Sequence, residues 1–180
     1  KIEDALIKIL SSPNHSNKSW ITNQYDQSVM CDTAQKSGSD AAIIRIHNKN
    51  KAIAVSVDSS ANYCKSDPFT GGKQIVCENW RNLIAVGAKP LAITNCLNFG
   101  NPENVEVMGE FAESLQGIKK ACEFLNYPVV SGNVSFYNGT NKKNIYPTPV
   151  IGGVGLIRKL TKPISHSFKS DKSNIILIGK

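Results

Sequence analysis

One amphipathic pattern between two strand-like segments constrains the fold most. Apolar residues recur at three- and four-residue steps over residues 107–125, which predicts a helix with one apolar face. A strand-like apolar run over residues 91–97 precedes this helix, and a shorter buried strand is predicted over residues 127–130. Helix and strand signals that alternate in this way favour a mixed α/β domain.

Both strand-like runs lead into segments rich in small, amide-bearing and hydroxyl side chains. We expect loops there, over residues 94–103 and 131–138. Such side chains suit a phosphate and a hydrated magnesium ion better than a hydrophobic core. If the two strands are neighbours, the loops share one mouth. Taken singly, each Asn or Ser in them is also an ordinary turn former.

The remaining patterns complete an α/β (α+β) fold. Strands are predicted over residues 41–46 and 52–57, a helix over residues 72–86, and one or two strands within residues 145–156, interrupted by prolines. This order predicts a mixed sheet whose helices cover one face.

Three parts are predicted along the chain. Residues 1–37 read as a linker with short helices, residues 38–166 as the folded domain, and residues 167–180 as the start of a following domain. The apolar run near the carboxyl end is typical of a buried strand, which needs neighbours. We therefore expect a fragment of a longer protein.

Charge and cysteine usage limit the function classes. The formal net charge is +7, but the basic residues are scattered as single lysines rather than clustered with aromatics, which disfavours a nucleic-acid-binding protein. The five cysteines are widely spaced without a C-x-x-C pair, which favours reduced thiols and a cytoplasmic protein. No apolar run reaches transmembrane length, so no membrane association is predicted.

Two further segments carry weaker chemical signals. The segment from Asp67 to Lys73 contains Gly71 and Gly72 and opens a predicted helix, where it either binds phosphate or forms a glycine turn that enters the helix. Asp58 ends a predicted strand and is either a metal ligand or a cap or surface ion-pair partner.

Several longer motifs occur along the chain, at residues 38–42, 67–68, 71–73, 81–83, 87–94, 97–103, 131–138 and 146–149. Together they resemble phosphoribosylformylglycinamidine synthase, an enzyme of purine biosynthesis, and more narrowly the carboxy-terminal half of its small bacterial synthase subunit. Residues 38 to about 160 resemble an ATP-binding domain of the kind found in aminoimidazole ribonucleotide synthetase.

The resemblance implies an ATP-dependent carbon–nitrogen ligase. ATP phosphorylates the formamide oxygen of formylglycinamide ribonucleotide (FGAR), and ammonia from a glutaminase partner displaces phosphate to give the amidine. ATP and Mg²⁺ are the implied cofactors. The implied partners are the remaining domains of the enzyme, a glutaminase subunit and a small accessory subunit.

The resemblance also assigns roles to four residues. Asn95 takes the place of an ATP-contacting acid, Gly132 that of a backbone ATP contact, Asn133 that of a magnesium ligand, and Ser135 that of a substrate contact. Asn95 departs from the usual Asp and supplies no negative charge. The family's catalytic histidines belong to the other half of the enzyme, so no catalytic residue is assigned here.

Two expectations follow from the two-halved architecture of this family. The domain pairs with a second such domain, so the isolated fragment is expected to be inactive and to form a homodimer through exposed apolar sheet surface. The alternative function is a non-catalytic, auxiliary nucleotide-binding and pairing module of the same enzyme.

Overall fold

The structure is a computed structural model that describes residues 1–36, 38–141, 143–160 and 164–179. It divides into two compact units, Lys1–Asp32 and Thr33–Lys180. Each unit is described by itself. The domain boundaries expected at residues 38 and 166 stay predictions.

The first unit is helical and exposes its apolar side chains. Helix α1 (Ile2–Leu10) begins with two acidic residues in its first turn, which suits the positive amino-terminal end of a helix. A short helix α2 (Ser19–Thr22) follows, with the 3₁₀ turns η1 (Pro13–His15) and η2 (Val29–Cys31) beside it in sequence. None of these elements contains a buried residue.

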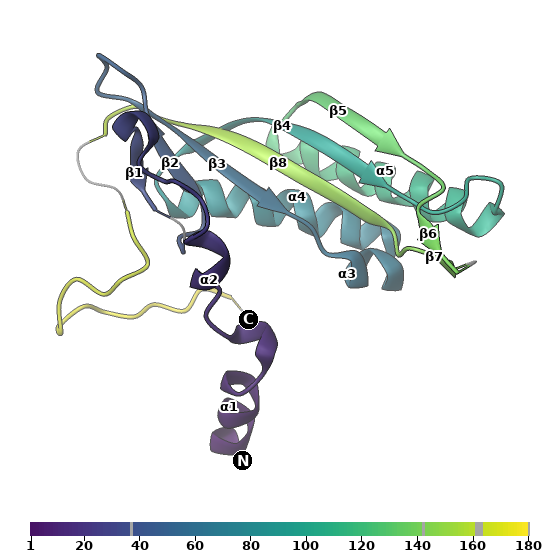
Figure 1. Ribbon diagram of the computed structural model, residues 1–180, viewed down its shortest axis with the longest axis horizontal. Coiled ribbons are helices and arrows are strands. Elements are labelled where there is room, and N and C mark those ends of the chain that lie inside the picture. Colours follow the sequence, from purple (N-terminus) through teal and green to yellow (C-terminus); the bar gives the residue numbers. More distant parts are fainter. Residues whose placement is uncertain (37, 142, 161–163, 180) are drawn as a thin grey trace. The chain divides into compact units, whose positions relative to one another are not determined.

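The second unit is built on a six-stranded sheet in the order β1-β2-β3-β8-β4-β5 (Figure 1). All neighbouring strands are antiparallel except the parallel pair β4–β5. A separate two-stranded hairpin pairs β6 with β7. The strands are β1 Thr33–Gln35, β2 Ala42–Arg45, β3 Ala52–Asp58, β4 Lys89–Asn98, β5 Val129–Ser135, β6 Gly139–Thr140, β7 Lys143–Asn144 and β8 Thr148–Ile157.

The three helices of this unit lie on one face of the sheet, as Figure 1 shows for the described residues. They are α3 (Ala61–Ser66), α4 (Pro68–Ala85) and α5 (Val105–Leu125). Helix α4 packs on β3, β8 and β4, and α5 packs against α4. Ile75 and Leu83 of α4 are fully buried against strand residues such as Ile151. The predicted fold class, a mixed sheet with helices on one face, is confirmed.

Among the described residues of this unit, no helix covers the opposite face of the sheet, which exposes apolar side chains. Strand alternation places on it the residues between those that face the core. We call this surface the open face and define it by four side chains that are 38–69% exposed: Ile44, Ile53, Val57 and Val154.

Helices α4 and α5 approach each other closely because they carry glycines at the contact. A Cβ on Gly72 would lie 2.4 Å from the carbonyl oxygen of Ser114, and one on Gly117 would lie 2.0 Å from that of Phe69. Gly71 packs in the same way against the backbone of Cys64 in α3. The glycines after Asp67 therefore lie inside α4 and serve helix packing, so the predicted glycine turn is wrong.

The predicted loops and several element boundaries need correction. Residues 94–98 lie within β4 and residues 131–135 within β5, so much of both expected loops is strand. Strand β5 is largely exposed rather than buried, because it is the last strand of the sheet. A single strand, β8, contains Pro149, and helix α3 was not predicted.

The carboxyl end has no helix or strand over the described residues 167–179, and Leu177 is 96% exposed. A strand there stays a prediction that depends on neighbouring segments. In the part of the chain that the structure describes, no helix is long and apolar enough to cross a membrane.

Candidate functional site

The two polar segments meet because their strands are parallel neighbours. In the β4–β5 register, Asn95 lies opposite Gly132, Cys96 opposite Asn133, and Asn98 opposite Ser135. Parallel strands end at the same edge of a sheet, so the residues that follow β4 and β5 emerge together. The two strands are therefore adjacent, which is the condition under which we expect the two polar segments to share one mouth.

Asn95 and Gly132 form the tightest contact of the pair. A Cβ on Gly132 would lie 1.9 Å from Oδ1 of Asn95 and 2.7 Å from its carbonyl oxygen. Asn95 is half-buried between Ile93 and Leu97, whose side chains belong to the core. Alternation therefore places the Asn95 side chain on the helix-covered face of the sheet, where it rests on the glycine.

Asn133 and Ser135 lie on the other face of the same strand. Ser131, which shares that face, donates a hydrogen bond from its Oγ to Oγ1 of Thr94 at 2.8 Å. The alternation thus separates Asn133 from Asn95 by the thickness of the sheet. Because β5 is the edge strand, a ligand at this edge has access to both faces.

The surface along β5 is a shallow depression of about 520 Å³. The Asn133 side chain is exposed there and makes no hydrogen bond with a described residue, so its amide oxygen is available to a ligand. The lining residues are Asn95 and residues 129–134.

Ser135 is tied into the turn that follows β5. Asn138 donates from Nδ2 to Oγ of Ser135 at 3.1 Å and to the carbonyl oxygen of Phe99 at 3.0 Å. These bonds join the end of β5 to the end of β4. They also restrict the position of the Ser135 hydroxyl.

A buried polar network lies under strand β3, which β8 separates from β4. Asn79 of α4 is fully buried and donates from Nδ2 to Oδ2 of Asp58 at 2.8 Å and to the carbonyl oxygen of Ser56 at 3.0 Å. Tyr127 donates from its hydroxyl to Oδ1 of Asn79 at 2.8 Å. Burial, reinforced by the charge of Asp58, raises the pKa of Tyr127 and keeps it a donor.

The network occupies the carboxylate of Asp58. Its Oδ1 accepts from Nδ2 of Asn82 at 2.7 Å, and its Oδ2 also accepts from Oγ of Ser56 at 2.7 Å. Neither predicted role for Asp58 matches this arrangement, in which the side chain anchors α4 to the end of β3. In the described ranges, no three His, Cys, Asp or Glu side chains are grouped to hold a metal ion.

Asn79 was missed by the sequence analysis, although the chain carries a signal for it. It falls on the same helical face as the buried Ile75 and Leu83, so it is a polar residue within an apolar stripe. Such a residue needs hydrogen-bond partners in the core. Its partners come from remote segments, so their identity does not follow from periodicity.

The start of α4 is a capped helix end. The Asp67 carboxylate accepts from the backbone N–H of Thr70 at 2.8 Å, and Pro68 occupies the first turn. This hydrogen bond is the main cause that lowers the pKa of Asp67. Lys73 lies over the ring of Phe69, with Nζ 4.5 Å from the ring centroid. The structure therefore supports a capping role there rather than a phosphate site.

A second polar hollow of about 460 Å³ lies beyond the ends of β4 and β5. Asn144 shapes it by accepting a hydrogen bond at Oδ1 from the backbone N–H of Asn101 at 3.0 Å. Asn104 and Tyr137 line the same hollow. These residues come from separate loops, and the sequence analysis did not bring them together.

The sheet and its polar edge define a domain of the synthetase type. Residues 38–157 match the family described as AIR synthase related protein, N-terminal domain. The chain belongs to this family.

Sequence relatives point to a more particular group. The chain is 58% identical over 180 residues to phosphoribosylformylglycinamidine synthase subunit PurL of Pelagibacter ubique (strain HTCC1062). This alignment covers 100% of this chain and 25% of the relative. The chain is 51% identical over 179 residues to the protein of the same name from Bradyrhizobium diazoefficiens, which covers 99% of this chain and 24% of the relative. The chain thus spans about a quarter of the length of these relatives.

Solved structures of PurL proteins are also similar to this chain. The structure of PurLQS from Thermotoga maritima matches with a TM-score of 0.76 and 36% identity, over 82% of this chain and 25% of that chain. T. maritima PurL complexed with ATP matches with a TM-score of 0.69 and 38% identity, over 79% and 23%. The same protein complexed with FGAR matches with a TM-score of 0.69 and 37% identity, over 79% and 23%.

Proposed function

We propose that this chain is the nucleotide-binding part of a phosphoribosylformylglycinamidine synthase, which converts FGAR to its amidine at the expense of ATP. The observation that carries the proposal is the β4–β5 register, which seats Asn95 on Gly132 and exposes Asn133 one position further on. The names of the relatives and the ATP and FGAR complexes of T. maritima PurL support it.

Each of the four residues has a task in this proposal. Gly132 lacks a side chain and lets the nucleotide approach the strand backbone. Asn133 offers an unengaged amide oxygen, the type of ligand that magnesium takes. Ser135, fixed by Asn138, contacts the substrate. Bound magnesium would offset charge on the transferring phosphoryl group.

The order of bond changes explains why ATP is needed. The formamide oxygen of FGAR receives the γ-phosphoryl group, which turns a poor leaving oxygen into a good one. Ammonia then attacks the carbon and phosphate departs. The residues of this chain bind and orient the reactants, which is the main contribution a protein makes to phosphoryl transfer.

Asn95 lowers the affinity that this site has for a cation. A neutral amide in place of the usual carboxylate removes one negative charge next to Gly132. The Asn95 amide can still hydrogen-bond a nucleotide, but it attracts a cation less strongly. We therefore assign magnesium to Asn133 and assign nucleotide contact to Asn95 and Gly132.

The site is completed by other parts of the enzyme. The exposed open face fits pairing with a second domain of the same type, and in the isolated fragment we expect a homodimer through that face. The fragment alone is proposed to be inactive. The proposed partners of the whole enzyme are a glutaminase subunit and a small accessory subunit, and its proposed location is the cytoplasm.

The second candidate function is an auxiliary nucleotide-binding and pairing module of the same enzyme. It is favoured by Asn95, because a site that lacks the usual carboxylate is less suited to metal-assisted phosphoryl transfer. In this case the domain contributes stability and not turnover.

Ammonia-dependent amidation by the full-length enzyme separates the two functions. We expect Asn133→Ala to lower turnover by at least about tenfold while the melting temperature is kept, since removing one positioned polar group costs on this order. Asn48→Gly serves as the control. Asn48 lies in an exposed turn and has a φ of 57°, which glycine adopts readily. Unchanged turnover with a lower melting temperature supports the auxiliary function instead.

A further inference from the structure

We propose that one end of the sheet is a docking surface for an acidic surface of a protein partner. The surface consists of five exposed cations, and we call it the cationic end: Lys49, Lys51, Lys89, Arg158 and Lys159. It lies at the end of β8 remote from Thr148, the residue that pairs with Asn98 at the candidate nucleotide site.

Strand register gathers these cations from three distant parts of the sequence. Ala52 pairs with Ile157, which sets Lys51 beside Arg158. The backbone N–H of Leu160 donates to the carbonyl oxygen of Asn50 at 3.2 Å, which holds Lys159 near the β2–β3 hairpin. Lys89 pairs with Leu156 on the other side of β8. Five basic residues that are dispersed along the sequence are therefore gathered at one end of the sheet.

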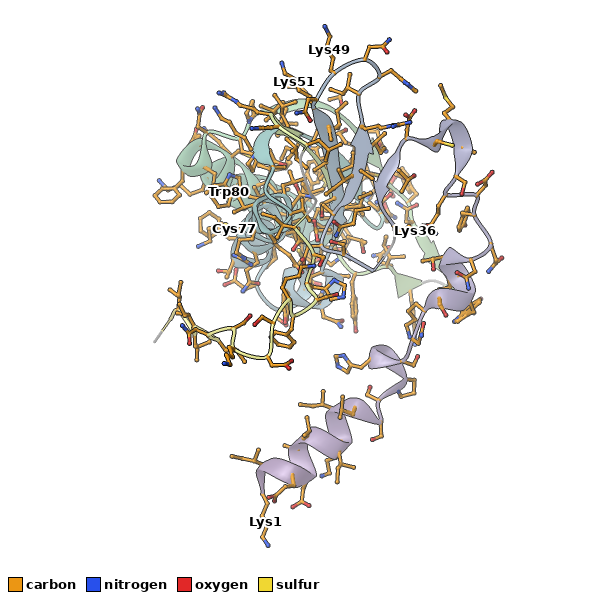
Figure 2. The ribbon with its side chains drawn as sticks, turned by 90° about the vertical axis from the view of Figure 1, so that its left-hand side faces the viewer. Lys1, Lys36, Lys49, Lys51, Cys77 and Trp80 are labelled. Carbon is orange, nitrogen blue, oxygen red and sulfur yellow. The ribbon has the colours of Figure 1, made fainter. Side chains whose placement is uncertain are left out.

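Figure 2 shows part of this end directly. Lys49 and Lys51 project from the hairpin at the top of the view, away from Cys77 and Trp80 of α4. Arg45 and His47 belong to the same hairpin, but each has an interaction of its own, so neither is counted in the cationic end.

The charge of this end is not balanced locally. The three segments that carry these cations, residues 41–57, 84–98 and 149–160, contain no Asp or Glu. Within the described part of the chain, none of the five cations makes an ion pair. Clustered like charges raise the local potential and attract an oppositely charged surface.

The position of the cations indicates that the partner is a protein. Alternation places Lys51, Lys89 and Arg158 on the same side of the sheet as Ile53 and Val154 of the open face. A partner that covers these apolar side chains meets the cations at its rim, where unpaired charges oppose association. This step rests on the proposed pairing of the open face.

The surroundings disfavour two other occupants. The three segments contain no Phe, Tyr or Trp, the side chains on which the bases of a single-stranded nucleic acid stack. A second copy of this chain carries a formal charge of +7, so a homodimer through the open face leaves the charge of the cationic end unbalanced. An acidic protein surface satisfies both the charge and the apolar neighbourhood.

Binding of a labelled poly-glutamate peptide of about twenty residues tests the proposal. We expect fluorescence anisotropy to show binding by the chain that weakens by about tenfold or more between about 50 mM and about 300 mM salt. Lys51→Glu/Lys89→Glu/Arg158→Glu should weaken it at least about tenfold. Lys36→Glu/Lys120→Glu/Lys169→Glu makes the same change of net charge at other exposed lysines and should alter binding less than about twofold. Circular dichroism checks that both variants fold.

Three results would overturn the proposal. Equal losses in both triple variants would show that binding follows net charge alone. Tighter binding of a single-stranded oligonucleotide or of anionic phospholipid vesicles than of the peptide would assign the surface to another class of partner. No binding of the peptide would also refute it. ATP binding by the full-length enzyme tests the proposed function separately, because the cationic end is remote from Asn133.

Discussion

Asn95 and Gly132 face each other across the parallel pair β4–β5, and a Cβ on Gly132 would lie 1.9 Å from Asn95 Oδ1. The glycine is therefore required by its neighbour, independently of the nucleotide contact that we propose for it. The contact links the stability of the sheet edge to the candidate site.

Gly132→Ala should destabilise the chain through this contact. The added methyl group displaces the Asn95 side chain, and overpacking of this kind costs about 1–3 kcal/mol of the free energy of unfolding. In an Asn95→Ala background the loss should be smaller, because Oδ1 is gone and only the backbone oxygen at 2.7 Å remains. Denaturant titrations measure the free energy of unfolding lost in each background. Equal losses in the two backgrounds would show that the Asn95 side chain is not the obstacle.

Gly117→Ala tests the close packing of α4 and α5. Its Cβ would meet the backbone oxygen of Phe69 at 2.0 Å, so the helices must move apart, and we expect a loss of about 1–3 kcal/mol in the free energy of unfolding. Gly109 lies in the same helix with nothing within 4 Å of its Cβ position, and Gly109→Ala should stabilise by up to about 1 kcal/mol. Thermal and chemical unfolding should both show a loss of stability in Gly117→Ala and a gain in Gly109→Ala. Destabilisation by both would refute the packing argument.

Tyr127→Phe probes the buried network around Asn79. It leaves Oδ1 of Asn79 buried without its donor, which costs about 1–3 kcal/mol of unfolding free energy. Tyr137 is 66% exposed, so Tyr137→Phe should change stability by less than about 0.5 kcal/mol. Similar values for the two substitutions would mean that the hydrogen bond to Asn79 contributes nothing.

The half-buried thiol of Cys122 predicts a loss of stability in alkali. Burial raises the pKa of Cys122 from 9.0 to about 11. Between these values the unfolded chain releases the proton first, so this contribution is complete below pH 9 and is lost as the pH rises to about 11. The melting temperature of Cys122→Ala should therefore fall less than that of the native chain between about pH 8 and about pH 10.5. Cys31 is exposed, and Cys31→Ala should follow the native chain. A parallel fall in Cys122→Ala would contradict the raised pKa.

The sequence predicts the elements whose patterns are local. The apolar stripe of α5 and the strands β2, β3 and β4 were found from periodicity and turn residues. The start of α4 was misplaced because Gly71 and Gly72 read as a turn, whereas the structure uses them where another helix comes close. Glycine serves both purposes, and only tertiary contacts distinguish them.

The candidate site was predictable in part for the same reason. The polar segments over residues 94–103 and 131–138 were expected to be loops that share one mouth. The resemblance to a family singled out Asn95, Gly132, Asn133 and Ser135. Their division between two faces of the sheet was not foreseen, because it depends on β5 continuing as a strand to Ser135. The network of Asp58, Asn79 and Tyr127 joins segments far apart in sequence, which periodicity does not reveal.

We propose that the β4–β5 edge binds ATP with magnesium through Asn133. Titration calorimetry of ATP into the full-length enzyme, with and without magnesium, tests this binding. We predict that Asn133→Ala weakens binding at least about tenfold in magnesium and much less in its absence, while Asn48→Gly stays within about twofold of the native enzyme. Equal ATP affinity in Asn133→Ala and the native enzyme at saturating magnesium would show that Asn133 does not hold the magnesium.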